Sequence, residues 1–143
     1  MVSPIFNQRT DAGMDMKITQ LDGWKLKAEY DGVSLVSGQA TRDSEYNGMS
    51  PGKLMTAGLG LCTGMHVVTY LTKHELEYSG LEITMGTVGA GKPARYGKFT
   101  MSIKLKADLS EEHYKGLVEE CNRCFVGNTI RGAPEIEIEL DTD

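Results

Sequence analysis

The chain has 143 residues, of which 40% are hydrophobic and 24% charged. This composition is typical of a globular domain, and the chain is too short for two ordinary domains. Its formal net charge of −5 argues against a surface for nucleic acid or anionic membranes, because no stripe of Lys and Arg is left over to contact phosphates. We therefore expect small molecules or another protein as partners, with no nucleic acid and no membrane among them.

The N-terminal stretch and the cysteines bear on the compartment. Residues 1–13 show no periodicity and are interpreted as an arm, followed by a single domain at 14–143. The stretch lacks the basic start and apolar core of a secretory signal, so we expect a cytoplasmic protein. Three cysteines, an odd number, do not form a structural disulfide framework. In the cytoplasm such cysteines are buried, metal-bound or redox-active.

The first part of the domain is predicted to be a sheet. Apolar and polar side chains alternate at 14–19, 24–30 and 33–35. Asp-Gly pairs at 22–23 and 31–32 separate these runs, and such pairs favour tight hairpin turns. The pattern therefore predicts a three-stranded antiparallel meander. A polar loop follows it and is either an edge of an active site or a simple connector.

A long helix is predicted next. Ser50 is a good N-cap, and Pro51 suits the first helical position. No Asp, Glu, Lys or Arg occurs from Leu54 to Thr72, so almost no face of this helix is made for water. A membrane span is disfavoured, because the run includes Thr, His and Gly and no second apolar span follows. We expect a buried core helix wrapped by sheet.

The two sides of this helix differ in chemistry. With successive residues about 100° apart, Ala57, Gly60 and Gly64 share one side, where another backbone can approach closely. Cys62 lies on the other side, with His66 one turn later. A thiol in an apolar wall beside an imidazole is the first chemical feature of the chain.

Two more strands are predicted at 81–85 and 99–105, joined by a Gly-rich connection at 86–97. Residues 86–92 match the spacing of a phosphate-binding loop. In such loops a Ser or Thr follows and a helix begins, whereas here Pro93 follows and leads into a strand. We therefore interpret the connection as a flexible hairpin loop and not as a nucleotide site.

The last part of the chain is predicted to be one helix and one strand. Ser110 caps a second, amphipathic helix whose apolar stripe includes Cys121. Cys124 comes where this helix should end, because a Gly-Asn pair follows closely. Alternation of Glu with Ile and Leu predicts a final strand at 135–140. Together the elements predict an α+β domain, with an antiparallel sheet around a long buried helix and a second, shorter helix.

From the residues alone, three interpretations of the cysteines stay open. All three are small buried hydrophobes in the first. In the second, Cys62 and His66 join the C-x-x-C pair of Cys121 and Cys124 in a zinc site. In the third, Cys62 is a redox nucleophile that a later cysteine resolves.

Two motifs in register add a family resemblance. Ser50-Pro51 is followed by Cys62, eleven positions after the proline, in a Gly-rich helix. Residues 124–130 read Cys-Phe-Val-Gly-Asn-Thr-Ile. These segments resemble the osmotically inducible protein C family, relatives of the organic hydroperoxide resistance proteins, whose second motif is Cys-Pro-Val-His-Asn-Thr-Leu. The order of strands, helices and cysteines agrees over about residues 14 to 141.

The resemblance implies a thiol-dependent peroxidase of oxidative-stress defence. Cys62 would attack an organic hydroperoxide and become a sulfenic acid, and Cys124 would then form a disulfide with it, later opened by a dithiol reductant. Cys121 has no role in this scheme, which uses thiols alone without a cofactor or a metal. The resemblance also implies an intertwined homodimer, with the small-residue side of the central helix as a seam between subunits.

One departure from the family concerns thiol activation. Family peroxidases use an Arg held by a Glu directly after the proline, and this position is Gly52 here. A cation is needed because burial raises the pKa of a thiol such as Cys62. The candidates are Arg42, Arg131 and His66.

The second motif departs as well. Phe125 and Gly127 replace its proline and histidine, which indicates a divergent member. Two alternative functions accompany the peroxidase. One is a non-catalytic protein of the same fold that binds a small molecule, and the other is a Cys/His zinc-binding protein.

Overall fold

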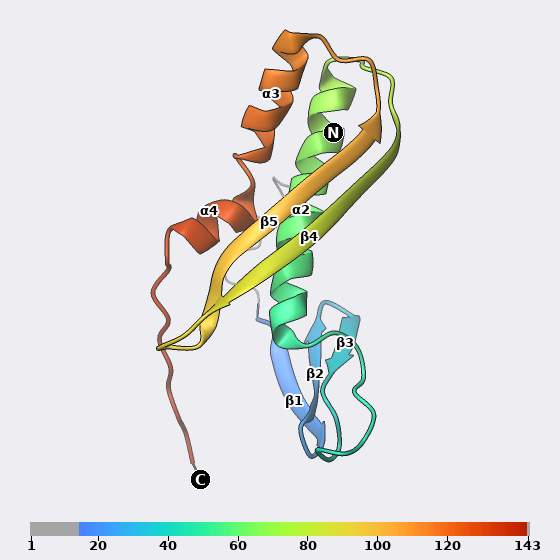
Figure 1. Cartoon of the computed structure of the whole chain (residues 1–143). Helices are drawn as coiled ribbons and strands as arrows, with labels where there is room; N and C mark the ends of the chain where they lie inside the picture. Colours follow the sequence, from blue (N-terminus) through green and yellow to red (C-terminus); the bar gives the residue numbers. More distant parts are fainter. Residues whose placement is uncertain (1–14, 143) are drawn as a thin grey trace.

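The computed structural model describes residues 15–142 and is an α+β arrangement of five strands and three helices within that range (Figure 1). The predicted arm at 1–13 lies outside the described residues. The elements in chain order are β1 (Lys17–Asp22), β2 (Lys25–Tyr30), β3 (Val33–Ser37), α2 (Pro51–Lys73), β4 (Ser79–Ala90), β5 (Arg95–Lys106), α3 (Glu111–Cys121) and α4 (Phe125–Arg131).

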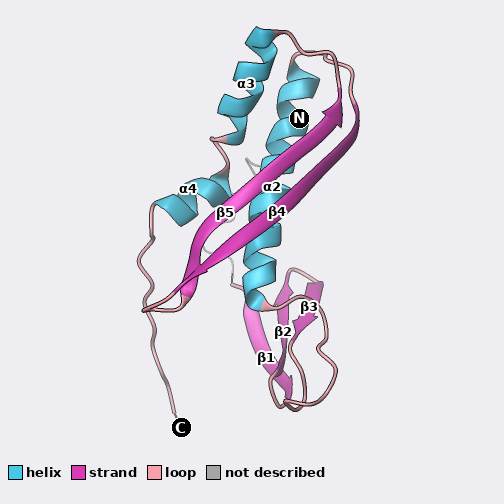
Figure 2. Ribbon diagram, viewed as in Figure 1, coloured by secondary structure: helices cyan, strands magenta, loops and turns pink. Residues whose placement is uncertain are grey.

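The predicted meander is confirmed as the antiparallel sheet β1-β2-β3. Its two turns need left-handed backbone, with φ of +56° at Gly23, +45° at Asp31 and +78° at Gly32. Glycine adopts this region without steric cost, and Asp tolerates it better than most residues. The sheet lies beyond the N-terminal end of α2 in Figure 2, and it makes few contacts with the other described strands and helices.

Strands β4 and β5 pair as one long hairpin that crosses α2 (Figure 1). The prediction of a loop at 86–97 was wrong, because β4 continues to Ala90 and β5 begins at Arg95. Gly86 pairs with Thr100, and a Cβ on it would collide with the Thr100 hydroxyl, so glycine fits this strand position. The phosphate-loop spacing therefore falls in a strand and a turn, with no helix after it.

The hairpin packs closely on α2 through two glycines. A Cβ built on Gly60 would lie 3.2 Å from the side chain of Met85, and one on Gly64 would lie 3.4 Å from Ile83. Met85 and Ile83 belong to β4 of the same chain. The small-residue side of α2 therefore packs inside the chain, in place of the predicted seam between subunits.

The core forms where α3 lies along the C-terminal half of α2. Val67 and Leu71 of α2 and Leu117 of α3 are buried together there. Ser50 and Ser110 cap their helices as predicted, each accepting a hydrogen bond from the N–H three residues on. Among the described helices, α2 is long and apolar enough to cross a membrane by length and composition, a property that core helices of globular domains share.

The expected burial of α2 is confirmed for one side only. On the other side Leu61, Met65 and Val68 follow one another at helical spacing, and their side chains are 64%, 40% and 39% exposed. A single chain therefore leaves an apolar stripe on its central helix open to solvent.

The C-terminal region differs from the prediction in two respects. The second helix ends near Cys124 as predicted, but a third helix, α4, for which Cys124 is the N-cap, was not predicted. The predicted strand at 135–140 does not form, because none of the strands described within residues 15–142 lies beside it. Its apolar side chains stand in solvent, with Ile136, Ile138 and Leu140 each more than four-fifths exposed.

Leu71→Ala should lower the free energy of unfolding by about 2–5 kcal/mol, because the deleted side chain leaves a cavity in the core. Leu71 is 0% exposed. Urea denaturation followed by circular dichroism measures the loss. Glu119→Ala, at an exposed position of α3, is the control and should change stability by less than about 0.5 kcal/mol. Equal effects of the two substitutions would contradict the core position of Leu71.

Candidate active site

Cys62 and Cys124 come together in the interior. Cys62 lies in the middle of α2, and Cys124 lies in the connection between α3 and α4. Their side chains are 2% and 1% exposed, and both pack with Leu59 in one buried cluster. Both are free thiols. The two cysteines singled out from the sequence are therefore neighbours, although 62 positions separate them in the chain.

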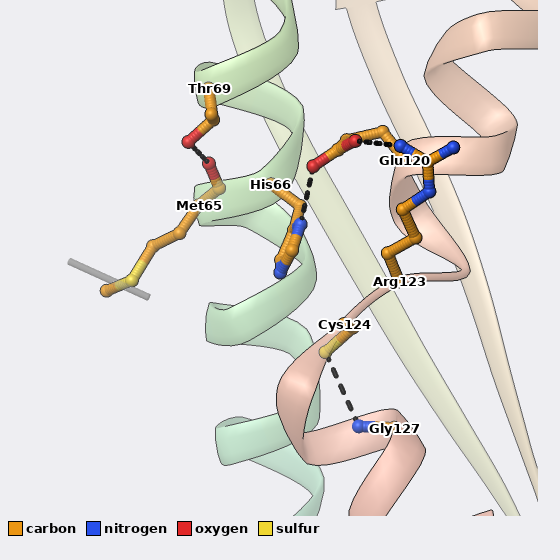
Figure 3. Close-up of polar contacts among 7 residues, drawn as sticks. All are labelled: Met65, His66, Thr69, Glu120, Arg123, Cys124 and Gly127. Carbon is orange, nitrogen blue, oxygen red and sulfur yellow. Dashed lines mark hydrogen bonds and ion pairs between the residues drawn. The ribbon is translucent and has the colours of Figure 1, made fainter. Parts of the chain in front are cut away.

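Cys124 is held by the start of α4. Its sulfur is the N-cap acceptor, receiving the Gly127 N–H at 3.5 Å (Figure 3). A Cβ added at Gly127 would lie 3.6 Å from Cys124 and from Leu59, which is ordinary van der Waals contact. Gly127 thus borders both Cys124 and the cluster residue Leu59.

The two thiols affect each other's ionisation. Burial raises the pKa of Cys62 most, and the Val126 N–H partly offsets it. The hydrogen bond and negative charge of Cys124 raise the pKa further, and the Phe125 N–H lowers it slightly. Burial also raises the pKa of Cys124, but hydrogen bonds from Cys62, Gly127 and Thr63 outweigh it, so its pKa is lowered. The proton of the pair therefore stays on Cys62, and the negative charge forms on Cys124.

An apolar cavity of ≈ 600 Å³ opens beside Cys124, between β5 and the helices α3 and α4. Its wall is mostly aliphatic and aromatic, with Thr63, Asn122 and Arg131 as polar members. Such a cavity accommodates a small apolar molecule and leaves a few polar groups to orient it. The other residues that line it are Leu59, Phe99, Met101, Ile103, Leu105, Leu109, Tyr114, Leu117, Val118, Cys121, Cys124, Gly127 and Ile130.

The three candidate cations lie in different places. Arg42 lines a separate hollow with Trp24, away from the thiols. Arg131 lines the apolar cavity, and its Nη1 donates to the Asn122 carbonyl at 3.5 Å. His66 is buried one turn after Cys62, and its Nδ1 donates to Glu120 Oε1 at 2.9 Å.

The position of the missing glutamate is filled by another side chain. A Cβ at Gly52 would lie 2.5 Å from the hydroxyl of Tyr96, so the ring of Tyr96 covers the start of α2. A longer side chain at Gly52 would require this ring to move. Tyr96 of β5 therefore occupies the space next to Gly52 that a larger side chain would need.

The zinc interpretation finds no support in the geometry. Cys121 packs half-buried against the core cluster of Val67, Leu71 and Leu117, and burial raises its pKa. Within residues 15–142 no group of three or more His, Cys, Asp or Glu side chains is arranged to hold a metal ion. The apolar stripe of α3 accounts for Cys121, as predicted.

Sequence reasoning missed two members of the site, Glu120 and Thr63. Glu120 precedes Cys121 and would be read as a solvated residue of an amphipathic helix. Thr63 lies in an uncharged run that indicates only burial. No local signal identifies either residue, since their partners lie on other elements.

Comparisons with known proteins give a consistent result. A family model described as OsmC-like protein matches residues 42–139, which include both Cys62 and Cys124. No curated protein matches the chain. An OsmC-like protein from Mycoplasma pneumoniae is similar in structure, with a TM-score of 0.71, 16% identity and coverage of 85% of this chain and 89% of that chain.

Two similar structures are organic hydroperoxide resistance proteins by name. The one from Legionella pneumophila has a TM-score of 0.54 and 20% identity and covers 85% of this chain and 92% of its own. The one from Bacillus subtilis has a TM-score of 0.52 and 19% identity, with 85% and 93% coverage. At these identities the likeness establishes a shared fold.

Cys62→Ala should raise the pKa of Cys124, because it removes the thiol that donates to the Cys124 sulfur. Cys62→Ser should keep most of the lowering, since a serine hydroxyl still donates. The ultraviolet absorbance of the thiolate, followed against pH in a Cys121→Ser background, measures both variants. If Cys124 titrated at the same pH in both, the contact between the two thiols would not control its pKa.

Proposed function

The chain belongs to the OsmC-like protein family, and on that basis we propose that it is a thiol-dependent peroxidase that reduces organic hydroperoxides in oxidative-stress defence. The observation that carries the proposal is the contact of two free, buried thiols, Cys62 and Cys124, beside an apolar cavity. Paired thiols next to an apolar cavity suit a two-cysteine reaction on an apolar substrate.

The reaction begins at Cys62. Its thiolate attacks the outer oxygen of the hydroperoxide, the S–O bond forms as the O–O bond breaks, and the leaving alkoxide takes a proton to become an alcohol. Cys62 is then a sulfenic acid. The Cys124 thiolate attacks the sulfur of this sulfenic acid, the S–O bond breaks as the S–S bond forms, and the leaving hydroxide takes a proton to become water. A Cys62–Cys124 disulfide results. A dithiol reductant restores both thiols.

The ionisation of the pair suits the second step. The pKa of Cys124 is lowered, and the thiolate is the form that attacks a sulfenic acid. Burial raises the pKa of Cys62, so its first attack requires a group that takes its proton. Both thiols lie in one buried cluster and interact with each other, as the formation of a disulfide between them requires.

The apolar cavity also supports a second candidate function. A protein of this fold that binds a small apolar molecule without reacting would use the same ≈ 600 Å³ space and would keep its thiols reduced. Reactivity toward peroxide separates the two functions.

We further propose that the protein is a cytoplasmic homodimer. The stripe of Leu61, Met65 and Val68 and the exposed segment 135–140 leave large apolar side chains in solvent, which a second copy would cover. The reducing cytoplasm keeps the three cysteines available as thiols.

One equivalent of cumene hydroperoxide should remove two thiols from the reduced wild-type protein, as measured by intact mass and thiol count. In Cys124→Ser a sulfenic acid should accumulate on Cys62, because the second thiol is missing. Cys62→Ser should not react, and Cys121→Ser is the matched control that should behave as the wild type. Hydrogen peroxide should react more slowly than the organic peroxide, since the cavity is apolar.

Thiols that persist in every variant would rule out the peroxidase and leave the binding function. If the sulfenic acid accumulated in the Cys62→Ser variant and not in the Cys124→Ser variant, Cys124 would be the residue that attacks the peroxide.

Leu61→Lys should convert the dimer into a monomer, because it buries a charge in the apolar stripe of α2. Light scattering after size exclusion measures the mass. Glu119→Lys, at an exposed position of α3, is the control and should leave the dimer intact. It changes the net charge by more than Leu61→Lys does, so a loss of the dimer in Leu61→Lys alone would not be an effect of net charge. A wild-type protein that is monomeric at high concentration would refute the dimer.

A further inference from the structure

The proposed reaction needs a group that takes the proton of Cys62, and the buried His66 is placed to do so. His66 is 4% exposed and follows Cys62 by four residues on α2. Residues at this spacing lie on the same face of a helix, with Cβ atoms about 5–6 Å apart. Helical side chains also lean toward the N-terminus of their helix, which for His66 is the direction of Cys62.

Glu120 fixes the ring of His66. The carboxylate of Glu120, on α3, accepts a hydrogen bond from the Nδ1–H of His66, on α2, at 2.9 Å. Its second oxygen receives Arg123 Nη1 at 3.4 Å. With Nδ1 carrying its hydrogen, a neutral imidazole keeps its lone pair on Nε2.

The other ring nitrogen is the unexplained atom. Nε2 of His66 is buried and has no hydrogen-bond partner among the described residues. Figure 3 shows it turned away from Glu120 and toward the N-terminal part of α2, the side on which Cys124 is drawn. A histidine kept only for packing would have both nitrogens satisfied, because an unpaired buried polar atom is costly.

We propose that His66 is the general base of this site and that Glu120 is its positioning residue. The inference rests on the proposed peroxidase reaction. His66 Nε2 takes the proton from the Cys62 thiol, directly or through one water, and the thiolate attacks the outer peroxide oxygen. The same proton then passes from Nε2 to the leaving alkoxide, so the imidazole ends neutral and the products are a sulfenic acid and an alcohol.

The groups around His66 support this assignment. From α3 it faces Glu120 with its partner Arg123, and Cys121 lies one residue further along. The thiol of Cys124 lies on the connection to α4. The strand β4 packs with Met85 and Ile83 against Gly60 and Gly64, on another side of α2, and presents no charged group at these two contacts. Arg131 lines the cavity beside Cys124 and donates to a backbone carbonyl, so it is a neighbour of the second thiol.

The test measures the nucleophilicity of Cys62 without peroxide. Reduced protein is alkylated with iodoacetamide between about pH 6 and 10, and peptide mass spectrometry gives the rate at each cysteine. His66→Asn keeps a donor near Nδ1 for Glu120 but has no atom in the place of Nε2. Glu120→Gln keeps the shape of the acceptor and removes its charge. His113→Asn is the matched control, because His113 also bonds through Nδ1, to the Tyr70 hydroxyl at 3.1 Å.

His66→Asn should slow alkylation of Cys62 at neutral pH by about tenfold or more, with a smaller loss in Glu120→Gln. The deficit should shrink as the pH rises, because hydroxide then removes the proton. His113→Asn should match the wild type. A Cys62 rate in His66→Asn within about twofold of wild type, or a deficit equal at every pH, would overturn the proposal.

Thermal unfolding checks that the variants fold. If His66→Asn does not fold, the alkylation rates of Glu120→Gln decide the test. The readout also separates the two proposals. If the wild-type protein does not react with peroxide but His66→Asn still shows the pH-dependent deficit, the peroxidase function is refuted while the role of His66 as the base for Cys62 is supported.

Discussion

The close approach of β4 to α2 is the constraint on which the rest of the structure depends. Gly60 and Gly64 present no side chain to the hairpin, so Met85 and Ile83 lie directly against the helix. Because β5 pairs with β4, the same contact sets the position of β5, which forms one wall of the apolar cavity, opposite α3 and α4. The close packing of Met85 on Gly60 therefore helps to place the thiols relative to the cavity.

Burial has two opposite effects on the chemistry of this site. It excludes water and raises the pKa of both Cys62 and Cys124, which by itself would make them inert. The contact between them resolves the conflict by placing charge on one sulfur and the proton on the other. The pair is thus prepared for two different steps, and its first member depends on a neighbour that can accept a proton, the role that we assign to His66.

The surface shows a conflict between pattern and packing. The stripe on α2 and the segment 135–140 have the spacing of buried elements, yet both lie in solvent in one chain. Alternating Ile and Glu favours a strand only when a neighbouring strand supplies hydrogen bonds and an apolar face. In our proposal a second copy covers the apolar side chains of both the stripe and the segment, so the homodimer would complete the surface.

The sequence by itself determined the features whose causes lie within a few residues. Ser50 and Ser110 predicted two helix starts, the Asp-Gly pairs predicted two turns, and the two cysteine motifs indicated the family. Tertiary structure alone decided the extent of the glycine-rich hairpin, the helix after Cys124 and the pairing of His66 with Glu120, which lie 54 positions apart. Caps and turns are local hydrogen bonds and local φ values, whereas a glycine strand or a buried hydrogen bond between side chains is stable only against a partner that packing brings from elsewhere in the chain.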